Sequence, residues 1–378
     1  MIIKNASVYT EDGIFVTKDI YIEGDSFTDC VEKVTDKSEI DASDCYAIPG
    51  LTDVHFHGCM GHDFCDGTRE AVDEMALYEA SVGVTNIVPA TMTLSEEMLL
   101  TICKTAKSYA EEGFLPKRAR FYGINMEGPF VAPAKKGAQN GEYIHDPDIA
   151  MFDRLNEASG GRVKLLAIAP EQNGAMELIE KKHHETVISL AHTCADYDTA
   201  IEAFEKGASH VTHLYNAMNP YTHRAPGPIG AAADKEKAEV ELICDGVHIH
   251  PASVRTTFKI FGDDRIILIS DSMRATGLED GDYTLGGQAV KVTGNLATLA
   301  DGTIAGSVTN LMDCLRTAVL KMGIPLSSAV KCAAVNPAKC VGIYDEHGSI
   351  SAGKKADVVL LKKADLSSKQ VIMNGQPL

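Results

Sequence analysis

The feature that most constrains the fold of this chain is a regular alternation of strands and helices that begins after residue 50. Short runs rich in β-branched residues alternate with amphipathic helical stretches, a pattern typical of parallel βα units. Eight strands are predicted, at residues 51–57, 84–90, 119–126, 163–168, 186–191, 209–214, 239–244 and 265–270. Eight such units predict an α/β fold of the (β/α)8, TIM-like barrel type.

Helical stretches lie between these strands and end at glycines, as the C-termini of helices prefer. The clearest are residues 69–83, 95–113 and 196–207. A doubly wound open sheet fits the same alternation, but it usually carries a glycine-rich phosphate loop after its first strand. The segment DVHFHGCMGHD, residues 53–63, is not a loop of that type, so the barrel is favoured.

The two ends of the chain have a different pattern. Residues 1–50 and 345–378 alternate apolar and polar residues between turn signals and show no helical period. We expect them to form one small β-sandwich domain beside a barrel domain of residues 51–344. A β-hairpin insertion around residues 281–303 is expected either to join the small domain or to cap the barrel.

Composition and charge exclude several classes of function. The formal net charge is −18 and the basic residues are dispersed, so nucleic acid is not an expected partner. The chain has no long apolar run and no secretion signal at its start, so we expect a cytoplasmic protein without membrane contact. The ten cysteines have no regular spacing, which is typical of reduced thiols.

Polar residues follow the predicted barrel strands at their carboxyl ends, where barrel enzymes place their chemistry. His55 and His57 stand one residue apart at the end of the first strand, which would turn both side chains to one face. The other strand ends carry Glu127, His192, His213 and Asp271. Each of these alone could cap a helix or bond a carbonyl group. Together, four histidines and two carboxylates predict a site for one or two divalent metal ions.

A divalent cation at this site would lower the pKa of bound water to about 7 and polarise a carbonyl group. Asp271 is the predicted catalytic residue, which takes a proton from the attacking water and passes it to a leaving nitrogen. Cys59, Cys65 and His62 are close to the histidine pair in the sequence. The cysteines lack the spacing of closed zinc sites and His62 is in a loop, so all three are expected to be structural.

Six motifs occur in order along almost the whole chain: DVHFHG, MEGPF, AHT, THLYNAM, DGVH and SDSMRATG. With KKGAQN and RAPGPIGAA, they resemble the N-acetylglucosamine-6-phosphate deacetylases of the amidohydrolase superfamily. The resemblance implies a barrel with a small β-sandwich built from both chain ends. It also implies a homodimer that removes the acetyl group from N-acetyl-D-glucosamine 6-phosphate, with a neighbouring subunit near the phosphate.

The resemblance further implies roles for individual residues. Glu127, His192 and His213 would hold the principal metal ion, with zinc or iron expected. His55 and His57 would hold a second ion, with Glu127 as the bridge. The residues expected to bind the phosphorylated amino sugar are Asn216, Ala217, Arg224 and His248. Arg224 has a planar guanidinium group that suits phosphate oxygens.

One position departs from the family pattern. Some members have a histidine in the loop after EGP that helps to polarise the acetyl carbonyl, and this chain has Gln139 there. We expect Gln139 to bind substrate as a neutral hydrogen-bond donor, while a second metal ion supplies the lost electrophilic assistance. Restored activity of Gln139→His in a protein without the histidine pair would support this coupling, and no restoration would count against it.

Two alternatives remain open on the sequence. Another amidohydrolase, acting on a cyclic amide or an aminated base, would use the same metal ligands without Arg224 and His248. Its catalysis would then not depend on a phosphate group. A non-catalytic barrel scaffold would be expected to have lost ligands, whereas every expected ligand type is present here.

Overall fold

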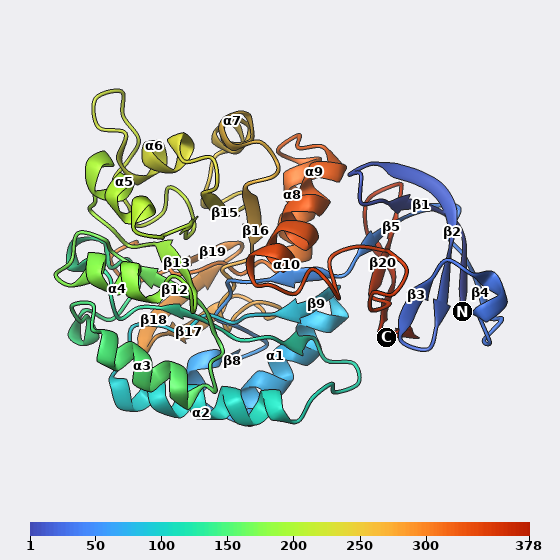
Figure 1. The fold of residues 1–378 in the computed structure, drawn as a ribbon, viewed down its shortest axis with the longest axis horizontal. Coiled ribbons are helices and arrows are strands. Elements are labelled where there is room, and N and C mark those ends of the chain that lie inside the picture. The colour runs from blue at the N-terminus through green and yellow to red at the C-terminus, as the bar shows by residue number, and fades with distance from the viewer.

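The computed structural model describes all 378 residues, most of which belong to an α/β barrel-type unit (Figure 1). Its strands are parallel and form two sheets, in the orders β10-β9-β6 and β11-β12-β13-β14-β15-β16. The strands are β6 Leu51–Asp53, β9 Val84–Ile87, β10 Arg120–Phe121, β11 Ile124–Glu127, β12 Val163–Ile168, β13 Val187–Leu190, β14 His210–Val211, β15 Glu239–Ile243 and β16 Ile266–Ile269. All eight predicted strand regions are therefore confirmed, although most of the strands are shorter than expected.

Backbone hydrogen bonds beyond the strands link the edges of the two sheets. The amide of Asp271, after β16, donates to the carbonyl of His55, after β6, at 2.9 Å. At the other junction, the amide of Asn125 in β11 donates to the carbonyl of Pro89 at 2.9 Å. These bonds bring the carboxyl ends of strands from both sheets to one end of the unit.

The third predicted strand is divided into β10 and β11 because it changes neighbours at Gly123. Its first part pairs with β9 and its second part with β12. A Cβ atom at Gly123 would lie 2.4 Å from the carbonyl oxygen of Arg162. Glycine therefore allows the two backbones to approach each other closely at the point where the strand bends.

Helices cover the outer faces of these strands (Figure 1), and the three clearest predictions are confirmed. α1 Arg69–Ser81, α2 Glu96–Glu111 and α5 Tyr197–Glu205 each begin with a side-chain cap and are followed by a glycine with positive φ. The others are α3 Ile149–Ala158, α4 Ala175–Lys182, α6 Gly227–Asp234, α7 Pro251–Phe261, α8 Leu311–Leu320, α9 Leu326–Val330 and α10 Asn336–Cys340. A cluster of 76 buried hydrophobic residues joins helices and strands. None of the helices combines the length and the apolar character that crossing a membrane requires.

Both chain ends contribute to an eight-stranded sheet at one side of the barrel unit (Figure 1). Its main order is β22-β21-β20-β5-β1-β2-β3, and β4 also pairs with β1. The strands are β1 Ile2–Tyr9, β2 Phe15–Glu23, β3 Ser26–Thr28, β4 Glu39–Asp41, β5 Cys45–Pro49, β20 Val358–Lys362, β21 Ser368–Met373 and β22 Gln376–Pro377. A separate cluster of 15 buried hydrophobic residues packs within this terminal sheet.

The predicted hairpin insertion forms its own antiparallel sheet. It consists of β17 Gly281–Leu285, β18 Gln288–Thr293 and β19 Leu296–Thr298, and none of these strands pairs with the terminal sheet. The side chain of Gln288 donates a hydrogen bond to the carbonyl of Ala138, in the loop after β11. Of the two expected arrangements, the insertion therefore adopts the one that caps the barrel. A further short pair, β7 Gly58–Cys59 and β8 His62–Asp63, lies between β6 and α1.

Candidate metal and substrate site

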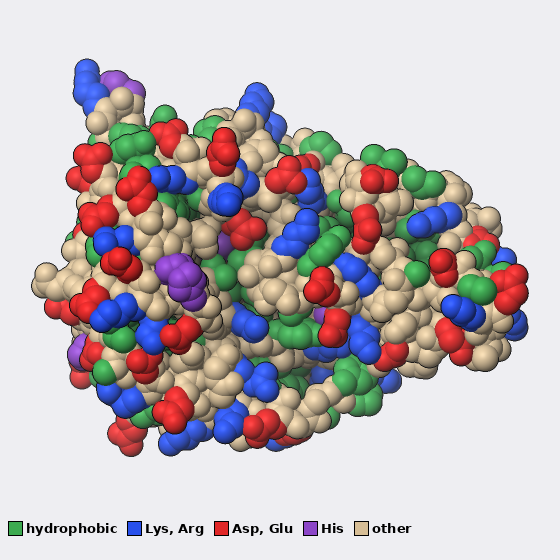
Figure 2. Space-filling view, in the orientation of Figure 1, with side chains coloured by type: hydrophobic (Ala, Val, Ile, Leu, Met, Phe, Trp, Pro, Cys, Tyr) green, Lys and Arg blue, Asp and Glu red, His purple; other side chains and the backbone are tan.

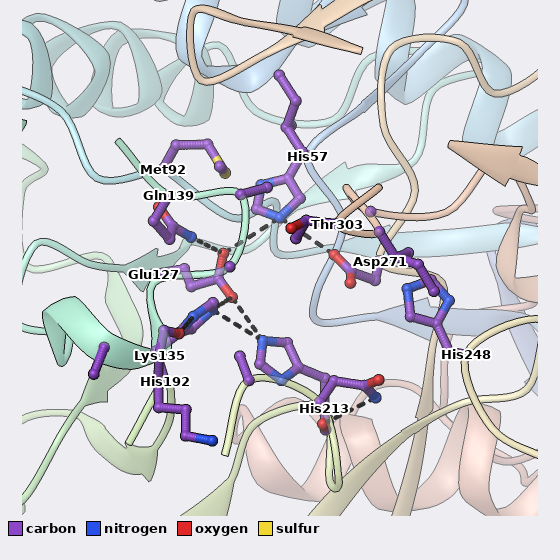
Figure 3. Close-up of a pocket in the computed structure, with 18 residues that line it drawn as sticks. His57, Met92, Glu127, Lys135, Gln139, His192, His213, His248, Asp271 and Thr303 are labelled. Carbon is purple, nitrogen blue, oxygen red and sulfur yellow. Dashed lines mark hydrogen bonds and ion pairs between the residues drawn. The ribbon is translucent and has the colours of Figure 1, made fainter. Parts of the chain in front are cut away.

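A pocket of about 380 Å³ opens at the carboxyl ends of the barrel strands (Figure 3). Five of its lining residues follow or end barrel strands: His57, Glu127, His192, His213 and Asp271. His55 is fully buried, and its Nε2 lies 3.5 Å from Glu127 Oε1 and 3.7 Å from Asp271 Oδ1. Leu285, Thr303 and Ile304 form another part of the wall, so the capping insertion and the segment after it enclose the site.

The six predicted ligands form two groups whose donor atoms lie close together. His55, His57 and Asp271 form one group, and Glu127, His192 and His213 form the other, with donor atoms within 4.8 Å of one another in each. The Glu127 carboxylate joins the groups, because its Oε1 is 3.0 Å from His213 Nε2 and its Oε2 is 3.4 Å from His57 Nε2. Glu127 therefore lies between the two groups of donor atoms.

The sequence predicted that the histidine pair lies at the end of a strand. This is wrong, because β6 already ends at Asp53. Beyond that point the chain pairs with the segment after β16, and the amide of His57 donates to the carbonyl of Ser272 at 2.7 Å. The two side chains still turn toward the same centre, where the imidazole ring centroids are 5.5 Å apart. Tertiary contacts, not the alternation of a strand, orient this pair.

Three of the candidate ligands have a left-handed backbone conformation. The φ angles are 44° at His192, 27° at His213 and 49° at Asp271. Residues with a Cβ atom rarely adopt positive φ, and such conformations cost about 1–3 kcal/mol each. Strain of this kind clusters at functional sites, where the surrounding structure holds the backbone in place.

The hydrogen bonds of the imidazoles leave nitrogen lone pairs that face the centre of the site. His192 Nδ1 lies 2.8 Å from the carbonyl oxygen of Lys135, which can only accept a hydrogen bond, so Nδ1 carries the proton and Nε2 faces Glu127 Oε1 at 3.1 Å. His55 Nε2 is buried and has no hydrogen-bond partner. Unpartnered imidazole nitrogens beside buried carboxylates are what a cation site requires, so these residues fit a divalent metal.

The carboxylates of the site are held in their ionised forms. Burial alone would raise the pKa of Glu127, but His55, His192 and His213 hold it well below its usual value. Burial likewise opposes ionisation of Asp271, yet the hydrogen bond and charge of His57 lower its pKa. The ionised Asp271 at the edge of the pocket can accept a proton. The two carboxylates also give the site negative charge, which favours a bound cation.

Gln139 lines the pocket, but its amide group is already engaged by protein atoms. Its Nε2 donates to Glu127 Oε2 at 2.7 Å, and its Oε1 accepts from the amide of Thr93 at 2.6 Å. Figure 3 shows the Gln139 side chain directed at Glu127. The observed contacts orient a candidate metal ligand, and Gln139 also lines the pocket in which the sequence predicted it to bind substrate.

Three of the four expected sugar and phosphate residues, Asn216, Ala217 and His248, line the pocket. His248 Nδ1 lies 2.7 Å from Asp245 Oδ2. Burial lowers the pKa of His248, but the hydrogen bond and charge of Asp245 outweigh it and raise the pKa above its ordinary value. The pocket thus contains a histidine whose charged form is favoured by a neighbouring buried carboxylate.

Arg224 is exposed and does not line the pocket, unlike the other expected substrate residues. It belongs to the segment between β14 and α6, which projects from the barrel unit (Figure 1). Lys or Arg and His side chains occupy the tip of that projection, while acidic and basic side chains are mixed over the rest of the visible face (Figure 2). The Arg224 side chain therefore does not reach the pocket of its own subunit.

Sequence reasoning missed three polar residues that contribute to the site. Glu241, Asp245 and Lys135 contact candidate site residues through hydrogen bonds. Glu241 had a recognisable signal, because a charged residue in the middle of an apolar barrel strand needs a partner in the core. Cys59, Cys65 and His62 belong to neither metal group and do not line the pocket.

Comparison with known proteins places this site in an established family. Residues 46–378 match the Amidohydrolase family, so the chain belongs to that family. A relative from Bacillus subtilis, an N-acetylglucosamine-6-phosphate deacetylase, is 37% identical over 368 residues, covering 96% of this chain and 93% of the relative. An N-acetylgalactosamine-6-phosphate deacetylase from Escherichia coli O157:H7 is 33% identical, covering 87% of this chain and 86% of the relative.

Solved structures agree with these relatives. The N-acetyl-D-glucosamine-6-phosphate deacetylase of Mycobacterium smegmatis, solved as a mutant in complex with N-acetyl-D-glucosamine-6-phosphate, superimposes with a TM-score of 0.91 at 31% identity. The match covers 100% of this chain and 98% of the other. The agreement extends over the terminal sheet as well as the barrel unit.

Proposed function

We propose that this protein hydrolyses the N-acetyl group of N-acetyl-D-glucosamine 6-phosphate, giving glucosamine 6-phosphate and acetate. The observation that carries the proposal is the convergence of four histidines, Glu127 and Asp271 on one pocket, in a chain whose relatives are named for this reaction. The family match restricts the chemistry to that of an amidohydrolase. The raised pKa of His248, which favours its cationic form in the pocket, supports a phosphorylated sugar as the substrate.

Glu127, His192 and His213 would hold the principal divalent cation, and His55 and His57 the second, with zinc or iron as the metal. The unpartnered Nε2 of His55 and the position of Glu127 between the groups support this assignment. A bound cation supplies a Lewis acid that activates water and polarises the acetyl carbonyl. Gln139 orients Glu127 through its 2.7 Å hydrogen bond.

Asp271 performs the proton transfers. Its carboxylate takes a proton from the water that attacks the acetyl carbon and delivers that proton to the sugar nitrogen as the C–N bond breaks. Asn216, Ala217 and His248 bind the sugar and its phosphate, which holds the acetyl group beside Asp271. Replacing Asp271 with Asn should abolish turnover and leave metal content nearly unchanged.

Arg224 reaches the phosphate from a neighbouring subunit in a homodimer. Its exposed position on a projecting segment supports this arrangement, because the guanidinium group is free to enter the pocket of a second copy. Arg is well suited to such a role, since its planar fork can bind two phosphate oxygens at once.

We also propose that the chain consists of two domains, which work in the cytoplasm. Residues 1–50 and 345–378 would form a β-sandwich, and residues 51–344 a closed (β/α)8 barrel. The separate hydrophobic cluster of the terminal sheet supports the first unit, and the backbone bonds between the sheet edges support the second. The ten cysteines are all free thiols, which suits a reducing compartment.

The test is acetate release by protein of measured metal content. N-Acetylglucosamine 6-phosphate, N-acetylgalactosamine 6-phosphate and unphosphorylated N-acetylglucosamine are compared, because one relative is named for the galactose isomer. Fast release from N-acetylglucosamine 6-phosphate, with little from the unphosphorylated sugar, is the expected result. No release by the metal-loaded protein, or full activity of Asp271→Asn, would overturn the proposal.

A further inference from the structure

One buried carboxylate contacts both groups of candidate metal ligands. Glu241 lies in β15, and its side chain is completely buried in the interior of the barrel unit. Its Oε2 accepts a hydrogen bond from His55 Nδ1 at 2.9 Å and another from the backbone amide of His213 at 3.0 Å. A single oxygen atom thus holds one residue from each group.

The other oxygen of Glu241 has no comparable contact. Oε1 has no hydrogen-bond partner, and the imidazole nitrogen His210 Nε2 lies 3.8 Å from it. Burying a carboxylate in an apolar core is costly unless hydrogen bonds and opposite charge compensate it. At Glu241 the compensation comes chiefly from His55 and His213, so the contacts to the candidate ligands are the main reason that a charge is tolerated here.

We propose that Glu241 is a positioning residue that holds the two metal groups in register with each other. At His55 it accepts the Nδ1 proton, which leaves Nε2 unprotonated and directed at the site. At His213 it accepts the amide proton of a residue with φ 27°, so it stabilises a strained turn that the side chain needs in order to face Glu127. The inference rests on the proposed function, because it takes His55 and His213 to be metal ligands.

The two contacts differ in what they control. The bond to His55 sets the tautomer and the rotation of the ring, so its loss acts directly on the donor atom. The bond to His213 acts on the backbone, which the preceding strand β14 also holds. We therefore expect loss of Glu241 to weaken the ion held by His55 and His57 more than the ion held by Glu127, His192 and His213.

The experiment compares Glu241→Leu and Glu241→Gln by metal analysis. Each protein is stripped with a chelator and titrated with Zn²⁺ by calorimetry, with circular dichroism and urea unfolding of the metal-free form to verify the fold. Loss of a hydrogen-bond partner behind a metal ligand usually weakens metal binding by about 10–100-fold, which is the effect expected for the second ion in Glu241→Leu. Glu241→Gln keeps an acceptor oxygen for both bonds but loses the charge, so it should weaken binding by less.

Glu79→Leu is the matched control. Glu79 is equally buried, and neither of its oxygens has a hydrogen-bond partner. The control should bind both ions as the wild type does, which separates positioning from the general effect of removing a buried carboxylate. If Glu241→Leu does not fold, Glu241→Gln decides the question.

Wild-type affinity for both ions in the folded Glu241 variants would overturn the proposal. An equal loss of metal in Glu79→Leu would also overturn it, because the effect would then be nonspecific. A wild-type protein that binds two ions but releases no acetate would refute the proposed function and leave this inference standing. The two ideas can therefore fail separately.

Discussion

Replacing Asp245 with Asn should weaken binding of the phosphorylated substrate above neutral pH, because Asp245 raises the pKa of His248. Burial lowers the pKa of His248, and the hydrogen bond and charge of Asp245 raise it above the ordinary value. His248 is positively charged below this raised pKa and loses its charge as the pH rises through it. The KM of the wild type should therefore be lowest below the raised pKa and increase above it.

The magnitude follows from the geometry of the pair. Asp245 Oδ2 and His248 Nδ1 are 2.7 Å apart in a buried setting. Unit charges about 4 Å apart attract by about 4 kcal/mol at an effective dielectric constant of about 20, so the Asp245 charge has a large effect on the protonation of His248. In Asp245→Asn the pKa of His248 should fall below its ordinary value. At about pH 7.5 we expect KM to rise by about tenfold or more, with kcat little changed and recovery at lower pH.

The assay is the initial rate of acetate release across the range from about pH 5.5 to pH 8.5. Asp357→Asn is the control for loss of a buried carboxylate beside a histidine away from the pocket, because Asp357 Oδ2 lies 3.1 Å from His347 Nδ1 and also 2.6 Å from Arg120 Nη1. Coincident KM profiles for the wild type and Asp245→Asn would refute the reasoning. If the KM profile of Asp357→Asn changes in the same way, the effect comes from lost stability and not from the charge of His248.

Three further predictions test other parts of the structure. Arg224→Ala and Asp271→Asn subunits, each inactive alone, should regain up to about a quarter of wild-type activity when they are mixed. About half of the dimers would then be hybrids, and each hybrid would have one intact site of its two. No recovery in verified hybrids would refute the proposal that Arg224 acts in the neighbouring subunit. Gln139→Ala removes both hydrogen bonds of the side-chain amide. Metal analysis should therefore show weaker retention of the principal ion, and urea unfolding should show a free energy of unfolding lower by about 1–3 kcal/mol. Unchanged metal retention would assign Gln139 to substrate binding instead. Burial raises the pKa of Glu79 in the folded protein well above its usual value. The contribution of the Glu79 side chain to stability is therefore full below the pKa of the unfolded chain, about 4.3, and is lost as the pH rises toward the pKa of the folded protein. Glu79→Leu should therefore be more stable by about 1–3 kcal/mol at about pH 8, and an equal or lower unfolding free energy would contradict this.

Much of the barrel could be predicted because its signals are local. The run of apolar residues in each strand and the caps at Thr68, Ser95 and Asp196 depend only on neighbouring residues. The polar strand ends could also be predicted, because parallel strands bring their carboxyl ends to one side. The groups of candidate ligands lie together for this reason.

The features that were missed depend on contacts between distant segments. β6 ends at Asp53 because the chain beyond it bonds to residues after β16, and the third strand bends at Gly123 because its two neighbours differ. The hydrogen bonds of Gln139 with Glu127 and Thr93, and the exposure of Arg224, are likewise set by residues far away in the sequence. The periodicity of the sequence contains no information about such pairings. Glu241 is different, because a glutamate within an apolar strand indicates that another residue in the core must bind its carboxylate.

The pairing of β5 with β20 has a consequence for biosynthesis. Cys45–Pro49 bonds along its length to Val358–Lys362, about 300 residues later. At a translation rate of about 5–20 residues per second, the ribosome needs roughly 15–60 s to supply the missing partner. During that time the first strands present an unpaired edge to other nascent chains. A protein whose last twenty residues were deleted would keep that edge permanently, so such a truncation should accumulate as aggregates although every pocket residue is still present.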